Sequence, residues 1–136
     1  MVKVIKNEKE MEKYYKENLE CFEFKCSVHF KFDVKEPFKS IVVDGDIIAD
    51  GNIYFNDVDC KNIRVKGDIH GSDIDCFNIT AKNISCWELI AGDIKTDHLS
   101  ATKITAIICD AKSIDVDAME VIKWLLKELL IIKKLR

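Results

Sequence analysis

The amino-acid sequence predicts a mainly β protein built as a parallel β-solenoid, with a short N-terminal helix and a C-terminal amphipathic helix. Two observations predict the solenoid. From Ile69 to Ile114 a large, mostly aliphatic residue recurs at every fifth position, and a smaller residue follows two positions later. Asp or Asn precedes most of the large residues, and both suit turns because their side chains bond nearby backbone. A five-residue period fits neither an α-helix nor a plain hairpin sheet, but it fits short strands and turns wound into stacked coils.

The large residue and its smaller partner are both predicted to face inward, because residues two apart on a strand point to the same side. In the regular part the large positions are Ile69, Ile74, Ile79, Ile84, Leu89, Ile94, Leu99, Ile104, Cys109 and Ile114. The repeat extends back to Ile41, where three steps are six residues long and each carries an added glycine: Gly45, Gly51 and Gly67. The solenoid is therefore assigned to residues 41–116.

Residues 1–40 are predicted to form a cap of one helix and one strand. Asn7 and Glu10 have the spacing of a capping box, so we expect a helix from Glu8 to about Asn18. The segment Phe22–Val34 then alternates apolar and polar residues without interruption. That pattern indicates a half-buried strand, or two strands with a bend. Pro37 should end it.

Two stretches resemble known solenoid families. The run Asn78–Cys86 resembles pentapeptide-repeat proteins, which are right-handed, four-sided β-helices, although here the small residue follows the large one instead of preceding it. The glycine-spaced segments Val43–Ile47 and Val65–Ile69 resemble the polymer-forming bactofilins, whose β-helix is three-sided. The resemblance covers residues 41–116 and implies a right-handed coil. It leaves the number of sides open.

Residues 117–136 are predicted to form a C-terminal helix that caps the solenoid and joins two copies of the chain. Asp117 and Glu120 again have capping-box spacing, and apolar residues cover most faces of a helix running from Ala118 to about Leu135. One face could shield the open end of the solenoid, and the others would need a partner. The residues expected at a homodimer interface are Val121, Trp124, Leu125, Leu129 and Ile132. The alternative is that the helix folds back on its own chain.

A candidate partner patch depends on the number of sides. If the coil had four sides, Trp87 and Ile107 would stack on the outside of the solenoid one coil apart. They would then form a small apolar surface for a docking element.

Composition and motifs point away from several functional classes. The net charge of −3 is mild, whereas a general nucleic-acid binder normally has a basic face. We expect neither a signal peptide nor a membrane-spanning segment, which places the protein in the cytoplasm. Of the six cysteines, Cys60, Cys76 and Cys86 fall at small inward positions and Cys109 at a large one, so we interpret them as small hydrophobes. The sequence predicts no catalytic residues, no metal site and no cofactor.

Residues 41–116 carry thirteen acidic and seven basic residues. An acidic rod can imitate duplex DNA, as some pentapeptide-repeat proteins do when they bind DNA gyrase. We expect the basic residues to interrupt the acidic ones, which favours an ordinary solvated surface. These residues are Lys61, Arg64, Lys66, Lys82, Lys95, Lys103 and Lys112.

The preferred functional hypothesis is a non-enzymatic solenoid that binds another macromolecule, most simply a host protein. A small chain of this kind would suit a phage or mobile-element inhibitor of a host nucleic-acid enzyme, such as a CRISPR nuclease or a topoisomerase. One alternative is a self-assembling, bactofilin-like scaffold. Another is an enzyme whose site forms between two chains.

Overall fold

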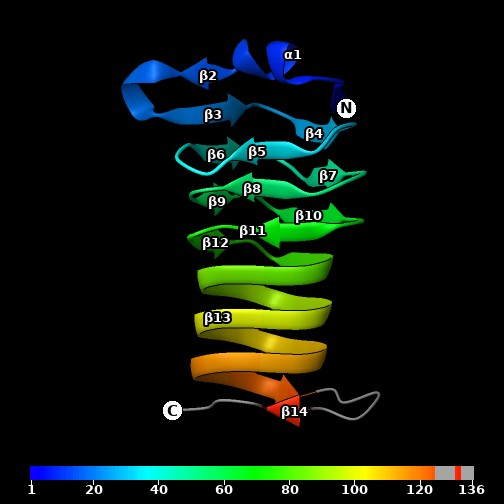
Figure 1. Ribbon diagram of the computed structural model, residues 1–136, viewed down its shortest axis with the longest axis vertical. Helices are drawn as coiled ribbons and strands as arrows, with labels where there is room; N and C mark the ends of the chain where they lie inside the picture. The colour runs from blue at the N-terminus through cyan, green and yellow to red at the C-terminus, as the bar shows by residue number, and fades with distance from the viewer. Residues whose placement is uncertain (125–130, 133–136) are drawn as a thin grey trace.

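The computed structural model describes residues 1–124 and 131–132 and shows a parallel β-solenoid (Figure 1). Three consecutive strands make one coil, and each strand pairs in parallel with its equivalent in the next coil. In one coil these are β6 (Ser40–Val43), β7 (Ile47–Ala49) and β8 (Ile53–Phe55), and in the next β9 (Val58–Asp59), β10 (Asn62–Val65) and β11 (Asp68–His70). The coil therefore has three sides and not four.

The three sides are named face A, face B and face C after the order in which the chain visits them. Face A contains β1 (Val2–Ile5), β4 (Ser27–Phe30), β7 and β10; face B contains β5 (Val34–Glu36), β8 and β11; face C contains β3 (Cys21–Phe24), β6, β9 and β12 (Asp73–Asp75). The long strand β13 (Asn78–Trp124) then winds through all three faces (Figure 1). It begins by pairing Ile79 with Ile63 on face A, Ile84 with Ile69 on face B and Leu89 with Ile74 on face C.

The predicted inward positions form the core. Every large residue of the regular repeat, from Ile69 to Ile114, is at most 1% exposed. The smaller partners are buried or half-buried, and Ala81, Ala91, Ala101, Ala106 and Ala111 all lie inside. Burying an aliphatic side chain contributes about 1.5–3 kcal/mol, so this continuous column of isoleucines and leucines is the main source of stability.

The glycines of the opening coils allow a longer step at a corner. Gly45 has φ +150°, a backbone conformation that residues with a Cβ atom rarely adopt. A Cβ atom there would lie 2.6 Å from the Ser27 hydroxyl oxygen in the coil before. The coil from Ile41 to Val58, which contains Gly45 and Gly51, accordingly takes seventeen residues, whereas the one from Ile69 to Ile84 takes fifteen.

The parallel pairing begins earlier than predicted. The alternating segment from Phe22 is two strands, β3 and β4, which pair with β6 and β7. Its apolar face points into the solenoid, where Phe22, Phe24 and Phe30 are fully buried and contact one another or Phe55. The segment assigned to a cap thus supplies a complete coil.

The predicted N-terminal helix is present but short. Helix α1 spans Glu8–Glu12, and the Asn7 side chain accepts a hydrogen bond from the Glu10 backbone N–H at 2.9 Å. Continuation to Asn18 was wrong: β2 (Tyr15–Lys16) pairs antiparallel with β3, and a 3-10 helix spans Glu17–Leu19. The reason is packing, because Tyr14 stacks on Phe24 and Tyr15 contacts Phe22. With Met11 fully buried, α1 covers the first coil (Figure 1).

The predicted C-terminal helix is wrong at its start. Strand β13 continues through residues 118–124, and β14 (Ile131–Ile132) pairs in parallel with Ser113 and Ile114. Met119 lies five residues after Ile114 and packs against the core, so the repeat continues past the predicted boundary. Of the expected dimer residues, Val121 and Trp124 lie in β13 and Ile132 in β14. Leu125 and Leu129 lie outside the described residues.

No helix in the described part is long and apolar enough to span a membrane.

Candidate functional site

A column of polar residues marks each corner of the solenoid, just before the inward aliphatic residue of the next strand. At the corner before face A, the Asn62 side-chain amide donates to Asp46 Oδ1 and the Asn78 amide donates to Asn62 Oδ1, both at 3.0 Å. At the corner before face B, the Asn83 amide donates to Asp68 Oδ1 at 2.9 Å. At both corners, therefore, a side-chain amide donates a hydrogen bond to the Asp or Asn oxygen at the same corner of the preceding coil, and this bond satisfies that oxygen as an acceptor.

The corner before face C is built differently, because carboxylates follow one another there. Asp57, Asp73 and Glu88 occupy this column, and the Asp73 backbone N–H donates to Asp57 Oδ1 at 3.2 Å. Desolvation raises the pKa of the Asp73 carboxyl, and the neighbouring charges of Asp57 and Glu88 raise it further. The column thus concentrates negative charge that the other corners dilute with amides.

Two more carboxylates lie on the outward surface of face C. Asp59 and Asp75 are direct partners on the neighbouring strands β9 and β12, so their backbones are about 4.8 Å apart. Like charges placed opposite each other on adjacent strands destabilise a sheet. Among the ion pairs of the described residues, none includes Asp57, Asp59, Asp73 or Asp75. These four exposed aspartates are named the aspartate grid.

The aspartate grid lines a shallow groove of about 470 Å³ on face C. Leu19 and Val42 also line this groove and are 60% and 42% exposed. Glu23 lies at its N-terminal end, where Lys25 contacts it at 2.6 Å and lowers the pKa of its carboxyl. The groove therefore combines exposed apolar side chains with unpaired negative charge, and we refer to it as the face C groove.

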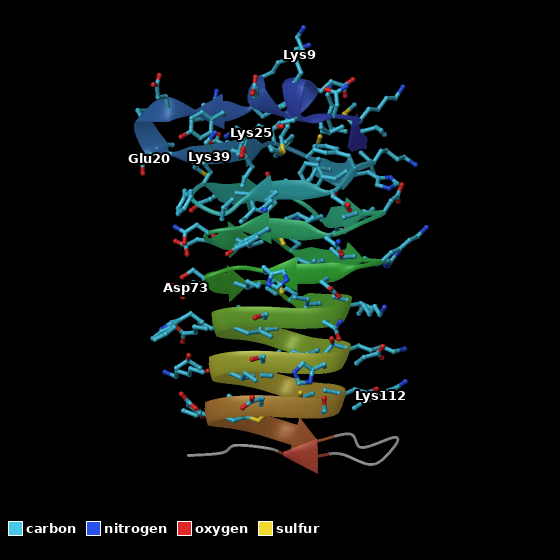
Figure 2. All side chains as sticks on the ribbon, in the orientation of Figure 1. Lys9, Glu20, Lys25, Lys39, Asp73 and Lys112 are labelled. Atoms are coloured by element: carbon cyan, nitrogen blue, oxygen red, sulfur yellow. The ribbon has the colours of Figure 1, made fainter. Side chains whose placement is uncertain are left out.

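Most of the basic residues lie outside face C, where they interrupt the remaining acidic residues, as Lys112 does 3.7 Å from Asp97. Strand register places two of them, Arg64 and Lys95, on the outside of face A. Three more follow face A at its corner with face B: Lys66, Lys82 and Lys112. Lys61 lies at the corner between faces C and A. Only Lys103 of the seven lies on face C, 3.9 Å from Glu88. Figure 2 shows Asp73 at one edge of the solenoid and Lys112 at the opposite edge.

The three-sided coil does not stack Trp87 on Ile107. Trp87 lies at the corner between faces B and C, where its backbone N–H donates to the Ser72 carbonyl. The fifteen-residue coil length places Ile107 at the corner between faces C and A, in the column of Phe77 and Gly92. Both side chains are well exposed, at 64% and 51%. The predicted single patch is therefore two separate positions that flank face C.

The four cysteines of the repeat take the inward positions predicted for them, and all six cysteines of the chain are free thiols. Cys60, Cys76 and Cys109 are buried, and Cys86 packs against the core. Burial raises the pKa of Cys76 and of Cys86 to about 12 and that of Cys109 to about 11. Thiols with such pKa values stay protonated at neutral pH and are poor nucleophiles.

The histidines are scattered over the surface of the solenoid. His29 contacts Asp50 at 2.7 Å, His70 lies beside the Tyr54 ring, and His98 bonds the Ser113 hydroxyl. In the described part of the chain, no three His, Cys, Asp or Glu side chains are placed to hold a metal ion. The fold does not require the corner carboxylates of the aspartate grid, because the equivalent corners use asparagine.

The spacing of the grid aspartates in the sequence equals the length of one coil, so the grid can be recognised from the sequence only when the coil length is known. Asp57 and Asp73 are sixteen residues apart, as are Asp59 and Asp75, and this is the length of the coil between them.

Comparison of the chain with family models, with curated proteins and with solved structures found no match in any of the three.

Proposed function

We propose that this protein is a non-enzymatic binding protein whose face C docks on the basic surface of another protein. The observation that carries the proposal is the separation of charge around the solenoid: four unpaired aspartates share face C, and six of the seven basic residues of residues 41–116 lie elsewhere. Complementary charge speeds association and rejects partners of the wrong sign. The same face repels phosphates, so nucleic acid is not the expected ligand.

The partner class that this charge suits is a protein that handles nucleic acid. Such proteins carry Lys and Arg surfaces that bind phosphates, and a rigid acidic face can occupy them. We therefore propose an inhibitor of a host nucleic-acid enzyme, such as a CRISPR nuclease or a topoisomerase, made by a phage or another mobile element. A cytoplasmic location goes with this role.

The experiment compares two variants that each lose four negative charges. The face C variant replaces Asp57, Asp59, Asp73 and Asp75 with Asn. The control variant replaces Asp44, Asp93, Asp97 and Asp115, which lie off face C, with Asn. Each is titrated into a DNA gyrase supercoiling assay and a Cas9 cleavage assay. We expect the unmodified chain and the control to inhibit one of these enzymes, and the face C variant to need at least tenfold more protein. Equal inhibition by both variants, or none by the unmodified chain, would overturn the proposal.

A second candidate function follows from the three-sided coil, which supports the bactofilin resemblance over the pentapeptide-repeat one. On this reading the solenoid is right-handed and assembles end to end into a scaffold. The N-terminal end opposes such stacking, because α1 buries Met11 against the first coil. Electron microscopy separates the candidates: filaments would favour the scaffold, and single particles the inhibitor.

A homodimer remains part of the proposal, although a helical interface from Ala118 to Trp124 is replaced by strand. Light scattering on the full chain tests it, since a dimer has twice the mass of the 15.6 kDa chain. A mass of one chain at micromolar concentration would rule the dimer out under those conditions.

A further inference from the structure

We propose that the face C groove binds an α-helix of the partner that carries an apolar side chain followed by cationic ones along a single stripe. This inference rests on the proposed function, because it uses the same face. It adds the shape and the residue order of the segment that the groove would accept.

The order comes from the column of outward residues that runs along the solenoid axis through face C. Strand register pairs Glu23 with Val42, Val42 with Asp59, Asp59 with Asp75, and Asp75 with Ile90. Ile90 is 42% exposed but does not line the groove. Within the groove, the column therefore presents Val42 and then two carboxylates that have no ion-pair partner among the described residues. Glu23 is already occupied by Lys25, so the complement begins with an apolar side chain on Val42.

A helix fits this column better than an extended strand does. Successive residues of the column are about 4.8 Å apart, the spacing of neighbouring strands. Side chains one turn apart on an α-helix repeat every ~5.4 Å, so three successive turns stay close to three successive coils. Residues that share a face of an extended strand repeat every ~6.7 Å. This repeat is much longer than the spacing of the coils, so after one contact the next side chain of the strand no longer lies opposite the next residue of the column.

The remaining side chains of the groove strengthen the same order. Leu19 lies in the 3-10 helix at the N-terminal end of the groove and is 60% exposed, so it widens the apolar part beside Val42. Asp57 and Asp73 stand two residues away from Asp59 and Asp75 along their strands, in a parallel column. A guanidinium or ammonium group over Asp59 or Asp75 therefore meets a second carboxylate nearby. The groove is apolar at one end and acidic at the other.

The test uses three synthetic helical peptides of equal length and the full-length chain. The first peptide places Leu, Arg and Arg at positions i, i+4 and i+7 of an alanine-rich helix. The second replaces the Leu with Gln, and the third replaces both Arg residues with Gln. Binding is measured by fluorescence anisotropy at about 0.15 M salt, where long-range attraction between exposed charges is largely screened. We expect the first peptide to bind at least tenfold more tightly than either of the others.

Variants of the protein show where the peptide binds. Val42→Thr, and separately Asp59→Asn with Asp75→Asn, should each weaken binding of the first peptide at least fivefold. Ile48→Thr is the matched control for Val42→Thr, because Ile48 projects outward from face A of the same coil, and it should leave binding unchanged. Circular dichroism melting confirms that each variant is folded.

The outcomes separate this inference from the proposed function. If the Gln-for-Leu peptide binds as tightly as the first, the apolar contact is absent and this inference is overturned, while an acidic docking face stands. If the aspartate variant binds every peptide as well as the unmodified chain, the acidic face does not bind cations and both proposals fail. If no peptide binds at all, the helical stripe is the wrong complement, and the enzyme assays alone decide the proposed function.

Discussion

The backbone N–H of Asp73 donates a hydrogen bond to Oδ1 of Asp57 at 3.2 Å, so two carboxylates follow each other at one corner of the solenoid. The equivalent corner before face A places Asn78 on Asn62, with an amide donating at 3.0 Å. The turn is therefore compatible with Asn, and the fold does not require a carboxylate at position 73. Residues that function requires often lower stability, so this corner is consistent with the docking role proposed for face C.

Asp73→Asn should stabilise the protein at neutral pH. The substitution removes a charge that desolvation disfavours and that Asp57 and Glu88 repel. Cross-strand pair effects are about 0.2–1 kcal/mol in size and solvent weakens them at an exposed residue, so we expect a gain of roughly 0.5 kcal/mol and a melting temperature about 2 °C higher. Thermal denaturation followed by circular dichroism at pH 7 measures it, and a lower melting temperature would contradict the explanation.

The same substitution has a predicted pH dependence. The pKa of Asp73 in the folded protein is raised above its ordinary value of 3.8, so the folded state binds this proton more tightly than the unfolded state does. Stability from this group is therefore highest below pH 3.8 and falls as pH rises through the folded-state pKa. The advantage of Asp73→Asn should be full at pH 7 and disappear near pH 3. An advantage that persists at pH 3 would assign the effect to something other than charge.

Ala81→Leu should overpack the interior. Ala81 is 7% exposed and faces the core, and added methylene groups in a filled core cost about 1–3 kcal/mol. The exposed neighbour Lys82 gives a matched control, because Lys82→Leu adds no interior volume and should change stability by less than about 0.5 kcal/mol. Urea denaturation of both variants measures the difference. Equal stability would mean that Ala81 does not face inward.

Gly45→Ala should destabilise the first corner of face A. The positive φ of 150° and the 2.6 Å approach to the Ser27 hydroxyl oxygen both oppose a Cβ atom. We expect a loss of at least about 1 kcal/mol, again from urea denaturation. Asp44→Ala, at the exposed position just before, is the control and should be nearly neutral. A neutral Gly45→Ala would show that this corner has another conformation.

The buried thiols should resist modification in the folded state. Burial raises the pKa of Cys76 to about 12 and that of Cys109 to about 11, so almost no thiolate exists at pH 8, and reaction with a thiol-specific reagent requires unfolding. Mass spectrometry of the labelled chain should show these cysteines modified slowly in buffer and rapidly in denaturant. Rapid labelling of Cys76 in buffer would place it outside the core.

The sequence predicted the inside of this molecule better than its outside. The pentad fixes which residues face inward, since positions such as Ile84 and Ala81 are set by strand alternation alone. It does not fix the number of sides, because fifteen and twenty residues are both whole numbers of pentads. The pairing of Asp59 with Asp75 depends on that number. The acidic face therefore became visible only once strand register was known.

At both ends of the chain, local sequence patterns typical of a helix gave wrong helix predictions, and the physical reason is the same. The capping-box spacing of Asp117 and Glu120 and the dense apolar residues after it favour a helix in isolation, yet the preceding coil offers a full row of backbone partners. Strand pairing then continues through Trp124. At the N-terminus, Tyr14 and Tyr15 similarly leave the helical pattern to pack on Phe24 and Phe22. Long-range pairing outweighs local propensity where an open sheet edge is adjacent.

The register of the coils is the relationship on which the acidic face depends, and nuclear Overhauser contacts in the NMR spectrum of the full chain measure it most directly. A three-sided coil predicts backbone contacts between Asp59 and Asp75, between Ile69 and Ile84, and between Ile74 and Leu89. Contacts between residues twenty apart, such as Ile69 with Leu89, would mean a four-sided coil. They would scatter the four aspartates and contradict the proposed docking face.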